Sequence, residues 1–348
     1  MVDGIQNMSF LTHNGYQIPK VPTELCWADR WGGWKARWAI GRMSYIVDPG
    51  LYAVGNPDGG SPVFVSANYK MSFDCLRSQL TGRDGWILVL DTKGINVWCA
   101  AGKGTFGTEE LVGRIEEVQL GDIVEHKTLI VPQLGAVGVS AHKVKRQSGF
   151  TVVYGPVRAE DLPAFLDAGM KATEQMRRVT FPLKDRIVLI PVELMTWGKQ
   201  LVLVAVCFLL LAGLSPKGYS TDLVMSDGIQ SVLILLAGFL AAGVLGPVLL
   251  PWLPGRSFSV KGLWIGFGML LLGGFLLDRY TSVLDDRFNM AAWALIVPAL
   301  TSFVVLNFTG ASTYTSLSGV KREVKIAVPL QIVCAVFGIG LWMAGRFI

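Results

Sequence analysis

The sequence predicts an α/β domain followed by an all-α domain of five transmembrane helices. Of its 348 residues, 51% are hydrophobic and only 16% are charged, with a mean hydropathy of +0.46, which is too apolar for an ordinary soluble protein. The charges are unevenly placed, because 42 of the 57 Asp, Glu, Lys and Arg residues lie in the first 199 positions. The change in polarity near residue 200 therefore indicates a domain boundary.

The predicted domain organisation has four parts. They are a Trp-rich segment at 1–45, an α/β domain at 46–182, a linker at 183–199 and a transmembrane domain at 200–348. The first half is long enough to bury a core of its own. Its start lacks the basic and apolar regions of a cleavable signal peptide, and five sparse cysteines favour reduced thiols, so we expect a cytoplasmic domain.

The Trp-rich segment contains four tryptophans at spacings of four, three and four residues, which places them on one face of a helix: Trp27, Trp31, Trp34 and Trp38. The commoner use of such a stripe is packing against a core. The alternative is an interfacial helix at a membrane surface, with the basic side chains of Arg30, Lys35 and Arg37 near lipid headgroups.

Four short, almost continuously apolar runs are typical of strands that are buried on both faces of a parallel sheet: 62–67, 86–91, 128–132 and 150–156. Helical patterns lie between or after them, at 72–80, 108–118 and 160–178. In such layered α/β domains, ligands bind beyond the carboxyl ends of the strands. We therefore expect functional residues in the loops that follow the strands.

Several familiar motifs are absent from the sequence. Lys103 lies between glycines, but the P-loop spacing fails, and the three histidines are scattered. No two cysteines are close enough for a cluster motif, so we expect neither an iron–sulfur cluster nor a structural zinc ion in this chain. Electrons for any redox step would then come from a partner. No block of like charges indicates nucleic-acid binding.

One cysteine follows the 86–91 strand in the segment GINVWCAAGKG, residues 94–104. A lone cysteine is most often a small core residue. Here Cys99 is followed by Ala100, Ala101 and Gly102, which would leave room for a broad, flat molecule near the backbone. Lys103, and a helix N-terminus if a helix begins here, would favour the thiolate.

The second half contains five apolar segments that approach the length of a membrane span, at 196–214, 229–250, 260–277, 290–308 and 324–344. Basic residues gather on one side, which predicts that this side and the first domain are cytoplasmic: Lys184, Arg186, Lys199, Arg256, Lys261, Lys321, Arg322 and Lys325. The spans offer almost no ionisable group at mid-depth, so we interpret them as an anchor and scaffold.

Residues 96–103, NVWCAAGK, resemble the cap-helix signature of the HgcA family of membrane corrinoid proteins that methylate mercury. The stretches 42–77 and 129–166 and the five-span tail are similar to the same family. More distantly, the first half resembles the large subunit of the corrinoid iron–sulfur protein of the acetyl-CoA pathway. The resemblance implies a Rossmann-like corrinoid-binding domain, with a cobalamin-type corrinoid between a cap helix and the sheet.

The resemblance also implies roles for individual residues. Cys99 would be the catalytic residue and the lower axial ligand of the corrinoid cobalt. The cap-helix contacts would be Asn96, Val97, Trp98, Ala100, Ala101, Gly102 and Lys103. Loop contacts would follow three strands, at Ser66, Ala67 and Asn68, at Gln133 and Leu134, and at Gly155 and Pro156. For each loop residue, a turn or core-packing role is an equal alternative.

The function implied is that of a corrinoid-dependent methyltransferase which passes a methyl group from cobalt to inorganic Hg(II), forming methylmercury at the cytoplasmic (inner) membrane. A thiolate is a softer ligand than imidazole and would favour departure of the methyl group as a carbanion equivalent or a radical. Implied partners are an HgcB-like ferredoxin with two [4Fe-4S] clusters, a folate-type methyl donor or its methyltransferase, and membrane lipid. The alternatives are a membrane-tethered methyl carrier of one-carbon metabolism and a corrinoid-binding transporter or sensor.

Overall fold

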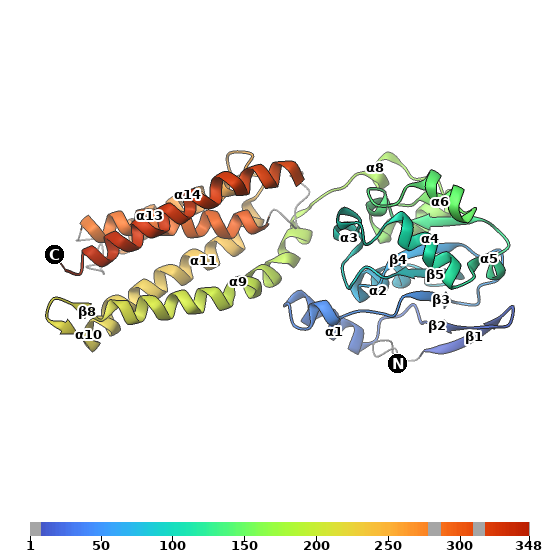
Figure 1. Ribbon diagram of the computed structural model, residues 1–348, viewed down its shortest axis with the longest axis horizontal. Helices are drawn as coiled ribbons and strands as arrows, with labels where there is room; N and C mark the ends of the chain where they lie inside the picture. The colour runs from blue at the N-terminus through green and yellow to red at the C-terminus, as the bar shows by residue number, and fades with distance from the viewer. Residues whose placement is uncertain (1–7, 278–286, 309–316, 348) are drawn as a thin grey trace. The chain divides into compact units, whose positions relative to one another are not determined.

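The structure is a computed structural model that describes residues 8–277, 287–308 and 317–347. The chain divides into two compact units, Met1–Val179 and Thr180–Ile348. The first is an α/β unit built on one sheet, and the second is a bundle of long helices (Figure 1). This confirms the predicted fold class.

A seven-stranded mixed sheet forms the centre of the α/β unit, in the order β1-β2-β3-β5-β4-β6-β7. The four predicted strands, β4 to β7, are confirmed and run parallel to one another. The sheet as a whole is mixed, because β3 pairs antiparallel with β5, and β1 with β2. The strands are β1 Ser9–His13, β2 Tyr16–Lys20, β3 Gly50–Val54, β4 Val63–Ala67, β5 Gly85–Leu90, β6 Thr128–Val131 and β7 Thr151–Tyr154.

The hairpin of β1 and β2 is one of the elements that the sequence interpretation missed. His13 pairs with Tyr16, so only Asn14 and Gly15 form the turn, and both have positive φ angles of 47° and 86°. An Asn-Gly pair is the preferred sequence for a two-residue hairpin turn of this kind. The signal for the hairpin was therefore present in the sequence.

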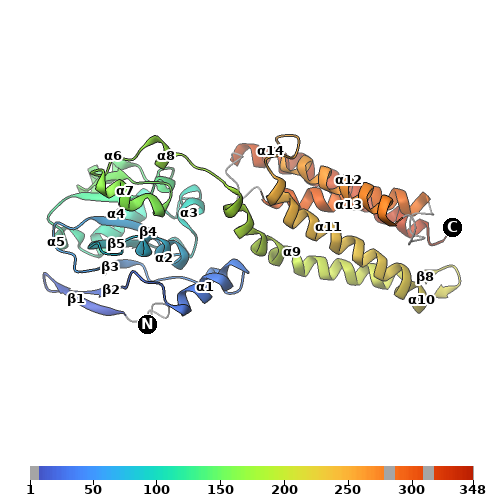
Figure 2. The same cartoon turned by 180° about the vertical axis from the view of Figure 1, so that it is seen from behind.

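Helices cover both faces of the sheet, which explains why its central strands are apolar throughout. On one face, Val65 and Leu88 pack with residues of α3 Val97–Lys103, α4 Thr108–Glu117, α5 Leu120–Ile123 and α6 Ala141–Ser148. On the other, Phe64 and Ile87 pack with residues of α2 Lys70–Ser78 and α7 Leu162–Asp167, the latter visible in Figure 2. Successive strand residues face opposite sides, so each face contributes its own core.

The single helix predicted at 160–178 is wrong. The structure has a 3-10 turn at Ala159–Asp161, then α7, and after a break the short helix α8 Glu174–Arg177. Gly169 and Met170 both have positive φ angles, of 66° and 62°. Two consecutive left-handed residues cannot continue a right-handed helix, so α7 ends before them.

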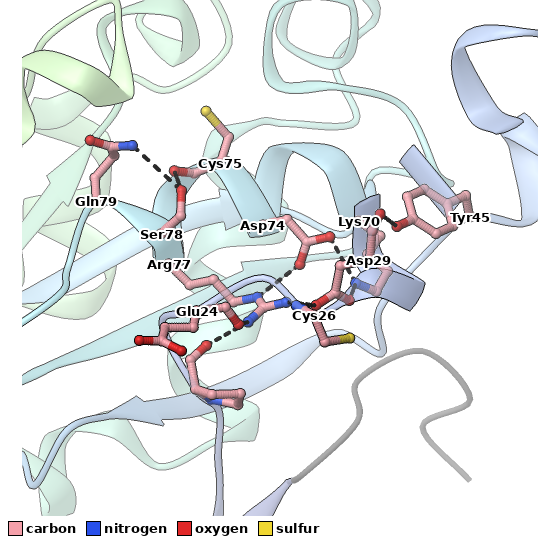
Figure 3. Close-up of polar contacts among 11 residues, drawn as sticks. Glu24, Cys26, Asp29, Tyr45, Lys70, Asp74, Cys75, Arg77, Ser78 and Gln79 are labelled. Atoms are coloured by element: carbon pink, nitrogen blue, oxygen red, sulfur yellow. Dashed lines mark hydrogen bonds and ion pairs between the residues drawn. The ribbon is translucent and has the colours of Figure 1, made fainter. Parts of the chain in front are cut away.

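Helix α1, Trp27–Arg37, is held against α2 by four buried charged side chains, the charged quartet Asp29, Lys70, Asp74 and Arg77 (Figure 3). The Lys70 ammonium lies 2.5 Å from Asp29 and 2.7 Å from Asp74, and the Arg77 guanidinium lies 2.8 Å from each carboxylate. Each cation thus bridges both anions. The formal charge of the quartet is zero, which limits the cost of its burial.

Tyr45 completes the contact between α1 and α2. Its hydroxyl donates to the backbone oxygen of Asp29 at 3.0 Å, and the Lys70 ammonium lies 5.4 Å from its ring centroid. A β-carbon on Gly32 would come within 2.6 Å of the Tyr45 ring. The glycine inside α1 therefore permits the close approach of Tyr45, which offsets the low helix propensity of glycine.

The second unit contains the long helices α9 Leu183–Ala212, α11 Ile229–Leu249, α12 Phe258–Leu277, α13 Arg287–Asn307 and α14 Leu317–Ala344. Among the described residues, four helical stretches are long and apolar enough to cross a membrane: Leu183–Ala212, Thr221–Leu249, Arg287–Asn307 and Gly319–Ala344. The described apolar part of α12, Phe258–Gly273, is shorter. Helices α12 and α13 approach closely, because β-carbons on Gly262 and Gly266 would clash with the backbone around Thr301 and Pro298.

The charged quartet predicts a specific loss of stability in acid. Burial alone would raise the pKa of Asp29, but its hydrogen bond with Lys70 and the nearby Arg77 lower that pKa to about 2, from 3.8. The native state therefore holds this proton less tightly than the unfolded state. The resulting stabilisation, about 2 kcal/mol, is complete above pH 4 and is lost as the pH falls towards 2.

We expect Asp29→Asn to remove this part of the pH dependence and to lower the stability of the α/β unit at pH 7 by about 3–5 kcal/mol, because two buried cations lose a partner. Native-state hydrogen exchange of sheet peptides measures both effects in the full chain. Asp167→Asn is the matched control, since its ion pair with Arg83 is exposed. Equal losses in the two variants would contradict the role of the quartet.

Candidate functional site

A pocket of about 450 Å³ lies where β4, β6 and β7 end. Ser66 lines it from the end of β4, Leu134 from the turn after β6, and Gly155 and Pro156 from the loop after β7. Because these strands are parallel, their carboxyl ends meet at one edge of the sheet, which is where ligands bind in this class of fold.

Helices α2 and α3 contribute much of the remaining wall of the pocket. Helix α2 contributes Met71, Ser72, Cys75 and Leu76, and the N-terminus of α3 contributes the three consecutive residues 96–98. Cys75 leaves α2 on the side away from the charged quartet (Figure 3). Cys75 is a free and exposed thiol.

The predicted cap segment forms helix α3, and Asn96 begins it. The side-chain oxygen of Asn96 accepts a hydrogen bond from the backbone N–H of Cys99 at 2.9 Å, as a helix N-cap does. Cys99 is thereby fixed as the third residue of the helix. It is half-buried and in no disulfide, and among the described residues no side chain or backbone group hydrogen-bonds its sulfur.

Asn68 positions the loop that leads into α3. Its side-chain oxygen accepts hydrogen bonds from the backbone N–H of Thr92 at 3.1 Å, the Thr92 hydroxyl at 2.8 Å and the backbone N–H of Gly94 at 3.0 Å. The side chain of Asn68 is buried and does not line the pocket. It therefore acts on the site by fixing the backbone between β5 and α3.

Seven of the site residues expected from the sequence line the pocket together: Ser66, Asn96, Val97, Trp98, Leu134, Gly155 and Pro156. Cys99 and Gln133 adjoin lining residues along the chain without being among them. Gly102 and Lys103 are exposed near the end of α3. Ala67 is buried in the sheet core.

Ala100 and Ala101 do not form the open, flat surface expected from their small size. Both are buried in the core between α3 and the sheet. A β-carbon on Gly138 would lie 3.1 Å from the Cα atom of Ala101 and 2.1 Å from the backbone oxygen of Phe106. The small residues of α3 thus allow the helix to pack closely against the backbone around Gly138.

The sequence interpretation missed the contribution of α1 and α2 to the pocket. Arg37 lines it from the end of α1, and Met71, Ser72 and Cys75 line it from α2. We expected functional residues in the loops that follow strands. Helix α2, which comes after the β4 loop, was not included in that expectation. The signal in the sequence was that the predicted helix at 72–80 comes soon after the predicted strand at 62–67.

Residues 41–166 match the profile of the protein family described as CO dehydrogenase/acetyl-CoA synthase delta subunit. The matched segment contains strands β3 to β7, helix α3 and all lining residues of the pocket except Arg37. The match thus covers the element that carries Cys99 and nearly all of the pocket wall.

Individual relatives align with the same region. The acetyl-CoA decarbonylase/synthase complex subunit gamma of Methanopyrus kandleri is 36% identical over 123 residues, which is 35% of this chain and 26% of that protein. The protein of the same name from Archaeoglobus fulgidus is 32% identical over 128 residues, 36% of this chain and 27% of its own length. The corrinoid/iron-sulfur protein large subunit of Moorella thermoacetica is 29% identical over 126 residues, 36% and 28% of the two chains.

The α/β unit is therefore related to the large subunit of the corrinoid iron–sulfur protein, which confirms this part of the resemblance. The chain spans about a quarter of the length of these relatives. The resemblance to the HgcA family stays a prediction, as do the ligand contacts of the individual site residues.

The hydrogen bonds of Asn68 predict how helix α3 and the loop before it respond when the Asn68 side chain is removed. In Asn68→Ala, two buried backbone N–H groups lose their acceptor, which we expect to cost about 1–3 kcal/mol in local stability. Hydrogen exchange of residues 92–100 in the full chain is expected to accelerate, while β4 and β5 stay protected. The matched control is Asn56→Ala at an exposed position. Unchanged exchange at 92–100 would argue against this positioning role.

Proposed function

We propose that the chain binds a corrinoid at this pocket and acts as a corrinoid-dependent methyltransferase, with inorganic Hg(II) as the methyl acceptor. The observation that carries the proposal is the half-buried thiol of Cys99, held in the first turn of α3 beside a pocket wall, within a segment related to a corrinoid protein.

The residues of the site fit such a cofactor. The pocket is lined mainly by apolar groups, with a few polar ones such as Ser66 and Asn96, as is usual in cofactor sites. A corrinoid is larger than this pocket, so the pocket would accept part of it while the remainder lies over the mouth. The Cys99 sulfur has no hydrogen-bond partner among the described residues, which leaves its lone pairs available to a metal.

A bound corrinoid supplies a cobalt ion that carries the methyl group. Cys99 would hold that cobalt through its sulfur, and a thiolate releases more electron density to a metal than an imidazole does. This favours departure of the methyl group with its bonding electrons, which a soft electrophile such as Hg(II) requires. Asn96 would fix the backbone at Cys99 through its hydrogen bond, while Val97, Trp98 and the loop residues would contact the cofactor.

The reaction also requires partners. Reduction of the cobalt would use an HgcB-like ferredoxin with two [4Fe-4S] clusters, and the methyl group would come from a folate-type donor or its methyltransferase. The apolar helices of the second unit support a multi-pass membrane protein. We place its α/β unit in the cytoplasm, because basic residues accumulate on one side of the proposed spans.

A methyl carrier of one-carbon metabolism is the second candidate function. The names of the relatives favour it, since several are subunits of an acetyl-CoA decarbonylase/synthase complex. This alternative keeps the corrinoid and Cys99 in the same roles, but the acceptor is not mercury. The two functions therefore differ in the product formed and not in the cofactor site.

Replacement of Cys99 tests the site and the reaction together. The full chain in nanodiscs is loaded with methylcobalamin, and its visible spectrum and its formation of methylmercury from Hg(II) are compared with those of Cys99→Ala and Cys99→His. We expect both substitutions to change the cobalt spectrum and to abolish methylmercury formation. Hydrogen exchange of the sheet verifies that the variants are folded.

Cys207→Ala is the matched control, because Cys207 is an exposed cysteine on α9 in the second unit. It should retain the wild-type spectrum and activity. An unchanged spectrum in Cys99→Ala would overturn the ligand assignment. If Cys99→Ala changes the cobalt spectrum but the wild-type chain forms no methylmercury, the methyl-carrier alternative is favoured instead.

A further inference from the structure

The four tryptophans of α1 and its C-cap form a continuous exposed aromatic surface, here called the Trp face. Neighbouring rings along it are in contact, with centroid separations of 6.2, 5.0 and 5.7 Å. Trp27, Trp31 and Trp34 are 76%, 46% and 48% exposed, and Trp38 is half-buried. The first two ring pairs are stacked on one another, not inserted into a core. The packing-helix interpretation therefore does not describe this face.

The outward position of the Trp face follows from what the rest of α1 does. The buried residues of the helix are Asp29 and Ala36. At 3.6 residues per turn they lie about half a turn round the helix from the tryptophans. The charged quartet fixes Asp29 against α2, so α1 cannot rotate to bury its aromatic side without breaking the two buried ion pairs that Asp29 makes with Lys70 and Arg77.

Basic residues flank the aromatic stripe on both sides. By helical geometry, Arg30 and Arg37 lie on one edge of it and Lys35 on the other. The one acidic residue of α1, Asp29, is buried on the opposite side. Ile40, Met43 and Ile46, in the segment that follows α1, are also exposed.

This combination matches the chemistry of a lipid bilayer interface. Tryptophan concentrates at the headgroup level of membranes, and basic residues beside an apolar face attract anionic lipids. Exposed apolar surface of this kind is unusual in a protein with no partner for it. The same chain contains the candidate membrane spans. The α/β unit ends at Val179 and the candidate span α9 begins at Leu183, so the segment between them extends over about 14 Å at most.

We propose that the Trp face of α1 lies in the headgroup layer of the membrane that the helical unit crosses. The tryptophan rings insert at the boundary between headgroups and acyl chains, and Arg30, Lys35 and Arg37 contact anionic headgroups. Because Arg37 also lines the pocket, docking of α1 holds one wall of the pocket at the membrane surface. The proposal requires no bound cofactor and is independent of the methyl acceptor.

Oxygen and nickel accessibility of a spin label tests the proposal in the full chain. A genetically encoded label replaces Trp27 or, in a second variant, Trp34, and the protein is reconstituted in nanodiscs that contain phosphatidylglycerol. Oxygen partitions into lipid and a nickel chelate stays in water. We expect both labels to collide more with oxygen than with nickel. A label at Val137, which is 85% exposed, should show the reverse.

The possible outcomes separate membrane docking from the alternatives. Nickel accessibility at positions 27 and 34 equal to that at 137 would mean that the Trp face is in water, and would overturn the proposal. Protection from both reagents would mean that another protein surface covers it, which also overturns it. Hydrogen exchange of the sheet in each labelled variant verifies that the fold is intact.

Charge reversal tests the role of the flanking basic residues. In a labelled Arg30→Glu/Lys35→Glu variant, we expect the label at Trp27 to lose oxygen accessibility and gain nickel accessibility in phosphatidylglycerol nanodiscs. Arg146→Glu, at an exposed position on α6, is the matched control and should leave both values unchanged. Identical accessibility in the reversed and control variants would contradict headgroup binding by these residues.

Discussion

Four charges without access to water hold α1 against α2, and the rest of the α/β unit depends on this contact. Such a cluster is tolerated only when every charge has a partner, and here each cation bridges both carboxylates. Helix α2 uses one side for the quartet, and Cys75 leaves it on another side (Figure 3). Met71 and Cys75 line the pocket. The same contact fixes the direction of the Trp face. One interaction thus sets both a wall of the pocket and an exposed surface.

The second wall of the pocket depends on hydrogen bonds of Asn68, which follows β4 directly. Asn68 holds Thr92 and Gly94 through three hydrogen bonds, and Asn96 then begins α3 and holds Cys99 in its first turn. Neither asparagine has to contact a ligand in order to influence the structure of the site. Their hydrogen bonds hold the backbone at the site, so the position of Cys99 depends in part on Asn68, 31 positions earlier in the sequence. The site is rigid because its support is buried.

The sequence predicted the elements whose signal is local. Strands β4 to β7 are mostly apolar because both sheet faces are covered, and helix α3 has its own N-cap in Asn96. The quartet could not be predicted, because Lys70, Asp74 and Arg77 have the spacing of a solvated helix face and their partner Asp29 lies 41 residues from Lys70. Ala100 and Ala101 were misjudged for a related reason, since small residues suit close helix packing as well as an open surface. Only tertiary contacts distinguish these uses.

The two walls place a constraint on any ligand of the pocket. One wall is fixed by ion pairs to α1 and the other by hydrogen bonds to the β5–α3 loop, so neither moves without the loss of buried polar contacts. A ligand must then fit the pocket largely as it stands, and a group too large for it has to project from the mouth. Trp98, which lines the pocket from the first turn of α3, is exposed, and Cys99 is the next residue of that helix. A large planar cofactor meets these conditions, because part of it can enter the pocket while its body lies outside.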